Sequence, residues 1–409
     1  MRLYFLLIRI AALCGHKKAQ LLVRGQRDTL VRIKQRDEVA AKEVVWFHSA
    51  SVGEFEQARP IIERLKSQDN AGNVRVVLTF FSPSGYEMRK NYAFADEIYY
   101  LPFATRRNAK AFIAAIRPTK VIFVKYEFWP AYLRELKAQK IPTYLISAIF
   151  RPGQLFFRWW GKWYRNLLHC FTKIFVQDED SCQLLAKYNI LRVLVVGDTR
   201  FDRVHAIAEQ SNAIPLIEHF ANVTKDVFQQ TPNRVIIAGS TWLPDEELLA
   251  RYVREHEDVK LVLVPHEIDK AHLDAIFNLF QGRLVRLSEA NAHSVEHVRT
   301  ILVDSMGLLS SIYRYGQVAY IGGGFGVGIH NTIEAAVYGV PVLFGPNYQH
   351  FREAKGLIAA NAGFSVANYG ELAAALDKAL EEHVRLGLNA RDYVNSELGA
   401  TERIMKSIF

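Results

Sequence analysis

The chain has 409 residues, half of them hydrophobic and 23% charged, with three cysteines. This length exceeds one average core, so we expect two domains, and the composition excludes a disordered or fibrous protein. Cys14, Cys170 and Cys182 are odd in number and form no C-x-x-C motif, which argues against a disulfide framework or a cysteine zinc site and favours a reducing compartment.

The net charge of +9 is concentrated in the first half of the chain. Residues 1–50 hold 10 Lys and Arg against 4 Asp and Glu, and residues 101–170 hold 13 against 2. Residues 171–409 carry a net charge of −7. A basic first half suits an anionic partner: a nucleic acid, an anionic lipid surface or an acidic substrate.

The N-terminus begins with an apolar stretch, LYFLLIRIAALCG, that only Arg9 interrupts and that basic residues follow. The stretch is shorter than the roughly 20 residues that span a bilayer, and no small-residue cleavage site follows it. We therefore predict that residues 1–30 form an interfacial helix on an anionic membrane surface. The alternative is an amphipathic helix that packs on its own domain.

The segment WFHSASVGEFEQARPIIERL, from Trp46 to Leu65, is predicted as a buried strand, a turn of small residues and a helix. This arrangement commonly presents backbone N–H groups to a phosphate. Glu54, however, occupies the helix start, where its carboxylate would repel an anion. A helix N-terminus favours the ionised form of that carboxylate.

Strand-length runs of Val, Ile and Leu alternate with helical patterns along the chain, which predicts two doubly wound α/β domains with parallel sheets. The predicted strands lie within 44–48, 74–80, 120–128, 142–147, 173–177, 192–197, 233–240, 259–265, 299–304, 317–323 and 340–345. We predict domains at 31–207 and 234–409, joined by a linker at 208–233. The last helix can pack back on the first domain. The carboxyl ends of both sheets are expected to face a shared cleft.

The most informative stretch of the second domain is YIGGGFGVGIHNTIEAA, a glycine-rich loop between a strand and a helix. Gly323 and Gly324 allow close backbone approach, and Asn331 or Thr332 can cap a helix whose N–H groups would hold a phosphate. Glu334 can accept hydrogen bonds from ribose hydroxyls. The alternative is a plain strand–helix turn, since the loop lacks a Walker lysine and resembles G-x-G-x-x-G only loosely.

Another strand of the second domain ends at Ser240 and Thr241, whose hydroxyls can contact a phosphate or simply cap the next helix. His266 follows the next strand, which is a weak signal alone.

In the first domain, Lys125, Glu127 and Arg200 follow strand ends and either face the cleft or form ion pairs on its rim. The segment QDED, residues 177–180, resembles a metal-binding D-x-D motif, but an acidic first helical turn is the better interpretation. We expect no metal ion.

Taken together, the motifs resemble one family of GT-B glycosyltransferases, the 3-deoxy-D-manno-octulosonic acid (Kdo) transferases of lipid A assembly. The segments that carry this resemblance are HSASVGEFEQARP, EFWP, GDTRFD, DSMGLL and GIHNTIEAA. The resemblance covers nearly the whole chain. It implies a GT-B fold, with two Rossmann-like domains facing a central cleft: an acceptor-binding domain at 31–207 and a nucleotide-binding domain at 234–409. It also implies an inverting transfer of Kdo from CMP-Kdo to a lipid A precursor, without a metal or other cofactor, at the cytoplasmic face of the bacterial inner membrane. We do not expect a nucleic acid as a partner.

By this resemblance Glu54 is the catalytic base, and Glu127 and Arg200 stabilise the transition state. The residues expected around the acceptor are Ser51, Gly53, Lys125 and Arg151. The residues expected to bind CMP are Ser240, Thr241, Pro265, His266, Met306, Gly307, Leu308, Gly323, Gly324, Asn331, Thr332, Ile333 and Glu334.

The sequence departs from the family pattern at several of these positions. His266 stands where the family usually has Arg, Arg200 where it has Lys, and Leu308 where it has an acidic residue. Lys125 stands in place of a carboxylate, and Arg151 is the nearest basic counterpart of a family segment that is absent here. The alternatives are another GT-B enzyme that uses a UDP- or ADP-sugar, a UDP-GlcNAc 2-epimerase, or a non-catalytic peripheral membrane protein that senses nucleotide.

Overall fold

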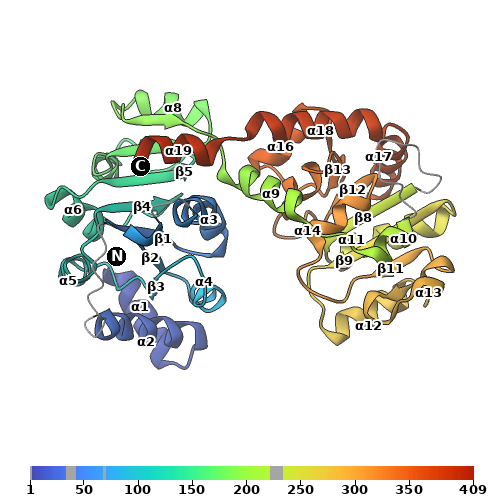
Figure 1. Cartoon of the computed structure of the whole chain (residues 1–409), viewed down its shortest axis with the longest axis horizontal. Coiled ribbons are helices and arrows are strands. Elements are labelled where there is room, and N and C mark those ends of the chain that lie inside the picture. The colour runs from blue at the N-terminus through green and yellow to red at the C-terminus, as the bar shows by residue number, and fades with distance from the viewer. Residues whose placement is uncertain (1, 34–42, 68–70, 222–233) are drawn as a thin grey trace. The chain divides into compact units, whose positions relative to one another are not determined.

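The computed structural model describes residues 2–33, 43–67, 71–221 and 234–409 (Figure 1). The chain divides into two compact units: Met1–Arg203 together with Leu398–Phe409, and Val204–Glu397. Each unit holds one seven-stranded sheet, and all the strand pairs described are parallel. The predicted class, α/β with two doubly wound sheets, is confirmed.

The sheet of the first unit has the strand order β3-β2-β1-β4-β5-β6-β7. Its strands are β1 (Glu43–Ser49), β2 (Val74–Phe80), β3 (Glu97–Tyr100), β4 (Lys120–Val124), β5 (Thr143–Ala148), β6 (Lys173–Val176) and β7 (Val193–Val195). The apolar runs predict all of these except β3, an edge strand of four residues with a single aliphatic side chain.

Helices cover both faces of this sheet. They are α1 (Arg2–Leu13), α2 (Lys17–Arg32), α3 (Val52–Lys66), α4 (Pro83–Arg89), α5 (Arg106–Ile116), α6 (Pro130–Ala138), α7 (Lys162–Leu168), α8 (Glu179–Ala186) and the start of α9 (Thr199–Gln210). Alternation along β1 separates two cores: Trp46 packs with α5 and α6 on one face, while Val45 and Phe47 pack with α3 on the other. The QDED segment forms the first turn of α8, as predicted, with Asp178 as its N-cap.

Helix α1 packs on the first unit and also exposes apolar side chains. Phe5 is buried, with its ring centroid 4.6 Å from that of Phe103. Leu6, Leu7 and Leu13 are exposed, Leu13 to 87%. Among the described residues, none of the helices has the length and apolar character that crossing a bilayer requires.

The sheet of the second unit has the order β10-β11-β9-β8-β12-β13-β14. Its strands are β8 (Arg234–Thr241), β9 (Val259–Pro265), β10 (Val285–Arg286), β11 (Thr300–Leu302), β12 (Val318–Ile321), β13 (Val342–Phe344) and β14 (Gly363–Ser365). The apolar runs do not predict β10 and β14, the two edge strands, because β10 has only two residues and β14 has the sequence Gly-Phe-Ser.

The helices of the second unit are the end of α9, α10 (Pro215–Ala221), α11 (Leu243–Glu255), α12 (Lys270–Leu279), α13 (Ala292–Glu296), α14 (Leu309–Ile312), α15 (Ile333–Ala336), α16 (Arg352–Ala359), α17 (Tyr369–Glu381) and α18 (His383–Glu397). Residues 208–221, which fall in the range predicted as a linker, form the end of α9 and α10 in this unit, and residues 222–233 lie outside the described residues.

The segment after α18 belongs to the first unit, where Figure 1 shows α19 (Ala400–Ile408) among its elements. Ile404, Met405 and Ile408 are buried in the core that α3 shares with β1. The carboxylate of Asp202 accepts hydrogen bonds from the backbone N–H groups of Gly399 and Thr401, both at 2.6 Å, and so fixes the start of this helix.

Candidate functional site

The turn after β1 places Glu54 in the first turn of α3, as predicted. Ser51 is the N-cap of this helix, and its backbone N–H donates to Oε2 of Glu54 at 2.7 Å. The Ser51 hydroxyl donates to the same oxygen. A Cβ atom on the neighbouring Gly53 would meet only Ser51 Oγ among the described residues, at 3.9 Å, an ordinary contact distance. The carboxylate is therefore fixed through one oxygen, and the glycine leaves room beside it.

Glu127, in the turn between β4 and α6, is almost fully buried and bonded to two aromatic side chains. Its Oε2 atom lies 2.5 Å from Nε1 of Trp129 and 3.0 Å from Nε2 of His48. His48 is fully buried at the end of β1, and its Nδ1 lies 2.9 Å from the hydroxyl of Thr79. This network connects Glu127 to the core of the sheet.

Arg200 is bonded to a buried aspartate. Its Nε and Nη2 atoms donate to Oδ2 of Asp198 at 2.9 and 2.7 Å, and Gln57 donates to Oδ1 at 3.3 Å. Burial alone would raise the pKa of Asp198, but the Arg200 charge, its hydrogen bonds and the Lys125 charge together lower that pKa. Lys125 has φ 54°, a left-handed backbone that is uncommon for a residue with a side chain.

Tyr126 is a residue that sequence reasoning missed, and it connects several predicted ones. Burial raises the pKa of its hydroxyl, the Arg151 charge lowers it, and the charges of Asp178 and Glu54 raise it. These groups therefore lie within electrostatic range of one tyrosine. The available signal was the position of Tyr126 between Lys125 and Glu127 at a strand end.

The glycine loop of the second unit is held by close backbone packing. A Cβ atom on Gly322 would lie 2.3 Å from the carbonyl oxygen of Ser240, and one on Gly324 would lie 2.5 Å from Gly345. The backbone N–H of Gly323 donates to Oδ2 of Asp245 at 3.0 Å. Burial raises the pKa of this aspartate, against hydrogen bonds that favour its charged form. Only glycine fits at these contacts.

The start of α11 is occupied by the protein's own carboxylates. Asp245 accepts a hydrogen bond from the backbone N–H of Trp242 at 2.9 Å. Thr241 is fully buried, and its hydroxyl donates to Glu246 at 2.9 Å, so this hydroxyl is used inside the protein. Ser240 is half-buried and has φ 54°. Of the two predicted hydroxyls, that of Ser240 is the more accessible.

His266 lies in a stack of three rings at the carboxyl edge of the second sheet. Its ring centroid is 4.8 Å from that of Trp242 and 4.4 Å from that of His330. Burial, and to a lesser extent His266, lower the pKa of His330. Sequence reasoning missed Trp242 and His330, because their spacing along the chain gives no sign of the stack.

The predicted Asn331–Glu334 segment leads into α15 (Ile333–Ala336), a single turn with Thr332 as its N-cap. The Asn331 amide donates to Glu334 at 2.9 Å and its oxygen accepts from the N–H of Ile333 at 3.2 Å. Ile333 is buried, and so is Thr332, whose hydroxyl has no hydrogen-bond partner within the described residues.

The remaining predicted positions lie at two other loop starts. Pro265 ends β9 and precedes His266. Met306 is 74% exposed, Gly307 has φ 90°, and Leu308 caps α14, so this loop presents backbone rather than charged side chains.

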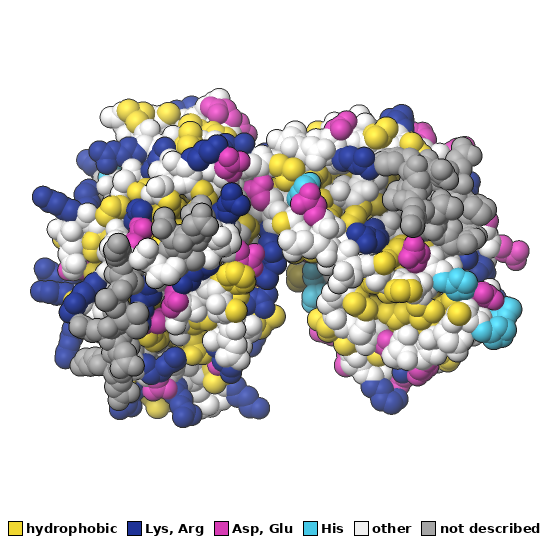
Figure 2. Space-filling model, viewed as in Figure 1, with side chains coloured by type: hydrophobic (Ala, Val, Ile, Leu, Met, Phe, Trp, Pro, Cys, Tyr) yellow, Lys and Arg dark blue, Asp and Glu magenta, His cyan; other side chains and the backbone are white. Residues whose placement is uncertain are grey.

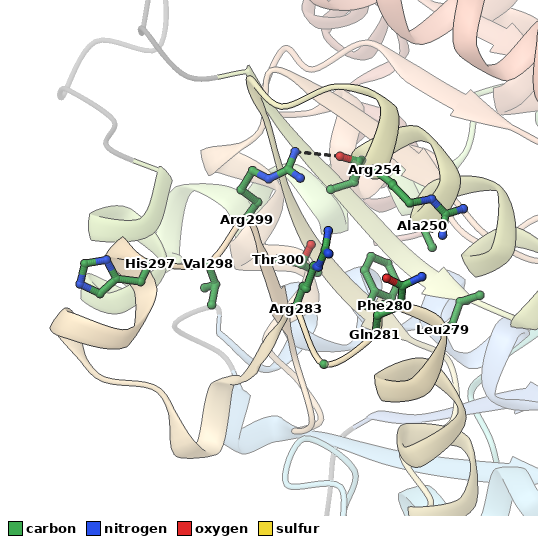
Figure 3. Close-up of a pocket in the computed structure, with 12 residues that line it drawn as sticks. Ala250, Arg254, Leu279, Phe280, Gln281, Arg283, His297, Val298, Arg299 and Thr300 are labelled. Atoms are coloured by element: carbon green, nitrogen blue, oxygen red, sulfur yellow. Dashed lines mark hydrogen bonds between the residues drawn. The ribbon is translucent and has the colours of Figure 1, made fainter.

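A cavity of about 340 Å³ lies elsewhere in the second unit (Figure 3). Its lining includes Arg254, Arg283 and Arg299, and Arg299 donates to the carbonyl oxygens of Val253 and His256, both at 2.8 Å. The cavity lies where α11 and α12 end and β11 begins. The glycine loop follows the end of β12, so the two features are at opposite edges of the sheet.

A group that can hold a metal ion is present, although none was predicted. Within the described parts of the chain, His293, Glu296 and His297 bring their ligand atoms within 4.8 Å of one another. His293 and His297 stand four residues apart, a metal-ligand spacing that sequence reasoning missed.

Comparison with known proteins identifies relatives of the chain. A family model described as 3-deoxy-D-manno-octulosonic-acid transferase matches residues 25–203. The 3-deoxy-D-manno-octulosonic acid transferase of Aquifex aeolicus is 28% identical over 348 residues, covering 83% of this chain and 86% of that protein. The corresponding enzyme of Haemophilus influenzae is 26% identical over 381 residues, covering 88% and 85%.

Solved structures show the fold. UDP-GlcNAc 2-epimerase from Neisseria meningitidis aligns with a TM-score of 0.62 at 17% identity, over 90% of this chain and 99% of that one. MurG from Acinetobacter baumannii aligns with a TM-score of 0.56 at 13% identity, over 90% and 99%. The fold is of the GT-B type. Along most of its length the chain is similar to 3-deoxy-D-manno-octulosonic acid transferases, and these relatives are glycosyltransferases.

Proposed function

We propose that the protein transfers Kdo from CMP-Kdo to a lipid A precursor, with inversion at the anomeric carbon and without a metal ion. Similarity to Kdo transferases supports Kdo as the transferred sugar. The surroundings of Glu54 support its role as the base. A base needs an ionised carboxylate with a free oxygen in a fixed position. Anchoring of Oε2 by Ser51 supports the fixed position, and the absence of close neighbours at Gly53 supports room for an acceptor beside the carboxylate.

In the proposed reaction, a primary hydroxyl of the acceptor attacks the anomeric carbon while Glu54 takes its proton. The bond between that carbon and the phosphate oxygen breaks, and CMP leaves with the bonding electrons. Glu127 and Arg200 are the groups proposed to stabilise the charges that develop. The glycine loop, His266 and Glu334 of the second unit are proposed to hold the nucleotide.

The single experiment that tests this proposal is a transfer assay on Glu54→Gln with CMP-Kdo and a lipid A precursor. Loss of a general base lowers kcat by roughly 10²–10⁴-fold. Glu56→Gln is the matched control, since Glu56 follows in the same helix but is paired with Arg59 and Arg89. Wild-type rates in Glu54→Gln would refute the base role, and mass spectrometry of the product counts the sugars added.

The donor is tested separately by calorimetric titration with CMP, UMP and UDP. We expect CMP to bind more tightly than either uridine nucleotide. A preference for uridine would remove the CMP-Kdo assignment and favour a GT-B enzyme with a UDP-sugar.

We also propose that the first unit binds the cytoplasmic face of an anionic membrane. Exposed apolar side chains of α1 support this, and so do Trp159, Trp160 and Trp163 near α7, of which Trp159 is 91% exposed. A groove of about 580 Å³, lined by Phe5, Arg134 and Trp163 among others, lies between the two regions. Exposed aromatic rings beside basic residues favour the interface of an anionic bilayer. Figure 2 shows many Lys and Arg side chains on the visible face of this unit.

Binding to vesicles of phosphatidylglycerol tests the membrane proposal. Deletion of α1 is unsuitable, because it would remove Phe5 from the core. We expect Leu6→Ser with Leu13→Ser, and separately Trp159→Ser with Trp160→Ser, to weaken sedimentation with vesicles. Leu388→Ser, an exposed leucine of the second unit, is the control. Unchanged binding in both double variants would contradict the proposal.

A further inference from the structure

The group formed by His293, Glu296 and His297 lies on one short stretch of the second unit. His293 and Glu296 belong to α13 and His297 follows directly, so the three side chains stand at positions i, i+3 and i+4. Residues at this spacing project from the same face of a helix. Their ligand atoms lie within 4.8 Å of one another, and all three side chains are exposed. The group is separate from every residue proposed above for catalysis or nucleotide binding.

A third imidazole reaches this group from another helix. His219 of α10 places its Nε2 atom 2.9 Å from Oε1 of Glu296, and α10 packs against α13. The rings of His293 and His297 lie with their centroids 4.6 Å apart. Three imidazoles and one carboxylate therefore meet at the contact between two helices.

An ordinary surface ion pair explains only part of this arrangement. His219 and Glu296 are both about half exposed, and an exposed pair of this kind contributes little to stability. It also gives no reason for two further imidazoles at its side. His297 also lines the cavity that contains the arginines, but in Figure 3 its ring points away from them.

We propose that His219, His293, Glu296 and His297 form a binding site for a divalent transition metal, with Zn²⁺ as the best match. Imidazole nitrogens with a carboxylate oxygen suit zinc, whereas Mg²⁺ and Ca²⁺ prefer oxygen ligands alone. The ligands come from α10 and α13, so a bound ion ties these helices together. This role is independent of the chemistry proposed at Glu54.

Calorimetry with ZnCl₂ on tag-free protein treated with EDTA tests the site, with MgCl₂ titrated in parallel. We expect one zinc ion per chain and no magnesium binding. His293→Ala and His297→Ala should each weaken zinc binding at least about tenfold, the cost that even outer-shell partners carry. His219→Ala should weaken it as well. His205→Ala is the control, because His205 is also paired with a glutamate: its Nδ1 atom lies 3.7 Å from Oε2 of Glu209.

Thermal unfolding gives a second measurement. Zinc should raise the Tm of the wild type, since an ion that binds only the folded state stabilises that state. Zinc should not change the Tm of the double variant that carries both His293→Ala and His297→Ala. These side chains are exposed, so the variants should keep the wild-type circular dichroism. Zinc binding that survives the double substitution, or that is absent in the wild type, would overturn the site. Full affinity in His219→Ala would overturn the link between α10 and α13.

Discussion

His48 is fully buried, and both of its ring nitrogens face hydrogen-bond partners. Nδ1 lies 3.2 Å from the carbonyl oxygen of Thr79 and 2.9 Å from its hydroxyl. Nε2 lies 3.0 Å from the Glu127 carboxylate, which only accepts hydrogen bonds when ionised, so Nε2 must carry a proton for this contact to be attractive. Trp129 is also 3.0 Å from Nε2, but its N–H is closer to the Glu127 oxygen, at 2.5 Å. His48 and Trp129 thus hold one oxygen of Glu127.

This arrangement predicts that His48 positions Glu127. We expect His48→Phe to lower kcat by about tenfold or more and to cause no further loss in a Glu127→Gln background, because groups that act as a unit are not additive. His48→Gln, which keeps an amide donor, should recover part of the activity. The measurement is kcat in the transfer assay, with thermal unfolding as the check on folding. Losses that multiply in the double variant would show that the two residues act separately.

Asp198 gives a prediction on pH. Its pKa is lowered in the folded protein, so its charge stabilises the fold above the ordinary aspartate pKa of 3.8, and this stabilisation is lost as the pH falls through the lower folded value. We expect Asp198→Asn to reduce the free energy of unfolding near neutral pH and to flatten its dependence below pH 3.8. Urea unfolding across this range measures both. An acid slope equal to that of the wild type would contradict the assignment.

Single residues were predictable where the chain itself marks them. A glycine before an acidic residue at a strand–helix turn locates Glu54 at the start of α3. His48 is different, because it lies inside an apolar strand and its partners are 31 and 79 residues away. Only the pairing of β1 with β2 and β4 brings these groups together.

At the level of elements, the glycine loop and α11 depend on each other. Asp245 in the first turn of α11 accepts the N–H of Gly323, and Gly322 packs on the backbone of Ser240 just before this helix. A methyl group at Gly322 would meet backbone atoms of Ser240 and Thr241 at 2.3 to 2.8 Å, so the loop would have to move.

We therefore expect Gly322→Ala to destabilise the protein by about 1–3 kcal/mol, the usual cost of overpacking, and to weaken CMP binding. Gly326→Ala is the matched control, because a Cβ atom there comes no closer than 3.6 Å to the carbonyl oxygen of Gly323. Urea unfolding and calorimetry with CMP measure the two effects. Equal behaviour of the two variants would show that the packing at Gly322 does not shape the loop.

The strands that the sequence predicts are those that lie within a run of apolar residues. All the central strands appear as apolar runs, whereas β10 has two residues and β14 has the sequence Gly-Phe-Ser. The edge strand β10 is only partly buried, and β3 has one aliphatic residue beside two tyrosines, so neither shows an aliphatic run. Predicted α15 is a helix of only four residues, because the chain turns back after Ala336 toward β13.

At the level of the whole molecule, charge differs sharply between the two halves of the chain. The stretch between Glu135 and Asp178 contains seven Lys and Arg and no acidic residue, and it includes the three exposed tryptophans. These basic side chains would attract an anionic membrane over a long range. Salt screens such an attraction, with a Debye length of about 10 Å at 0.1 M and about 3 Å at 1 M.

We expect binding to phosphatidylglycerol vesicles to fall strongly between 0.1 and 1 M salt, concentrations that span this screening range. Binding to neutral phosphatidylcholine vesicles should be weak and nearly independent of salt. Sedimentation of the protein with each vesicle measures this. Salt-independent binding to the anionic vesicles would show that the basic residues take no part in it.

The return of the chain to the first unit has a consequence for biosynthesis. Ile404, Met405 and Ile408 fill the core beneath α3, yet the ribosome makes them only after all of residues 204–397. Part of the apolar surface of the first unit therefore stays uncovered in the nascent chain until the residues of the second unit have been translated. A stalled chain that stops at Glu397 should accordingly be cut by protease in residues 43–203 more readily than one that continues to Phe409.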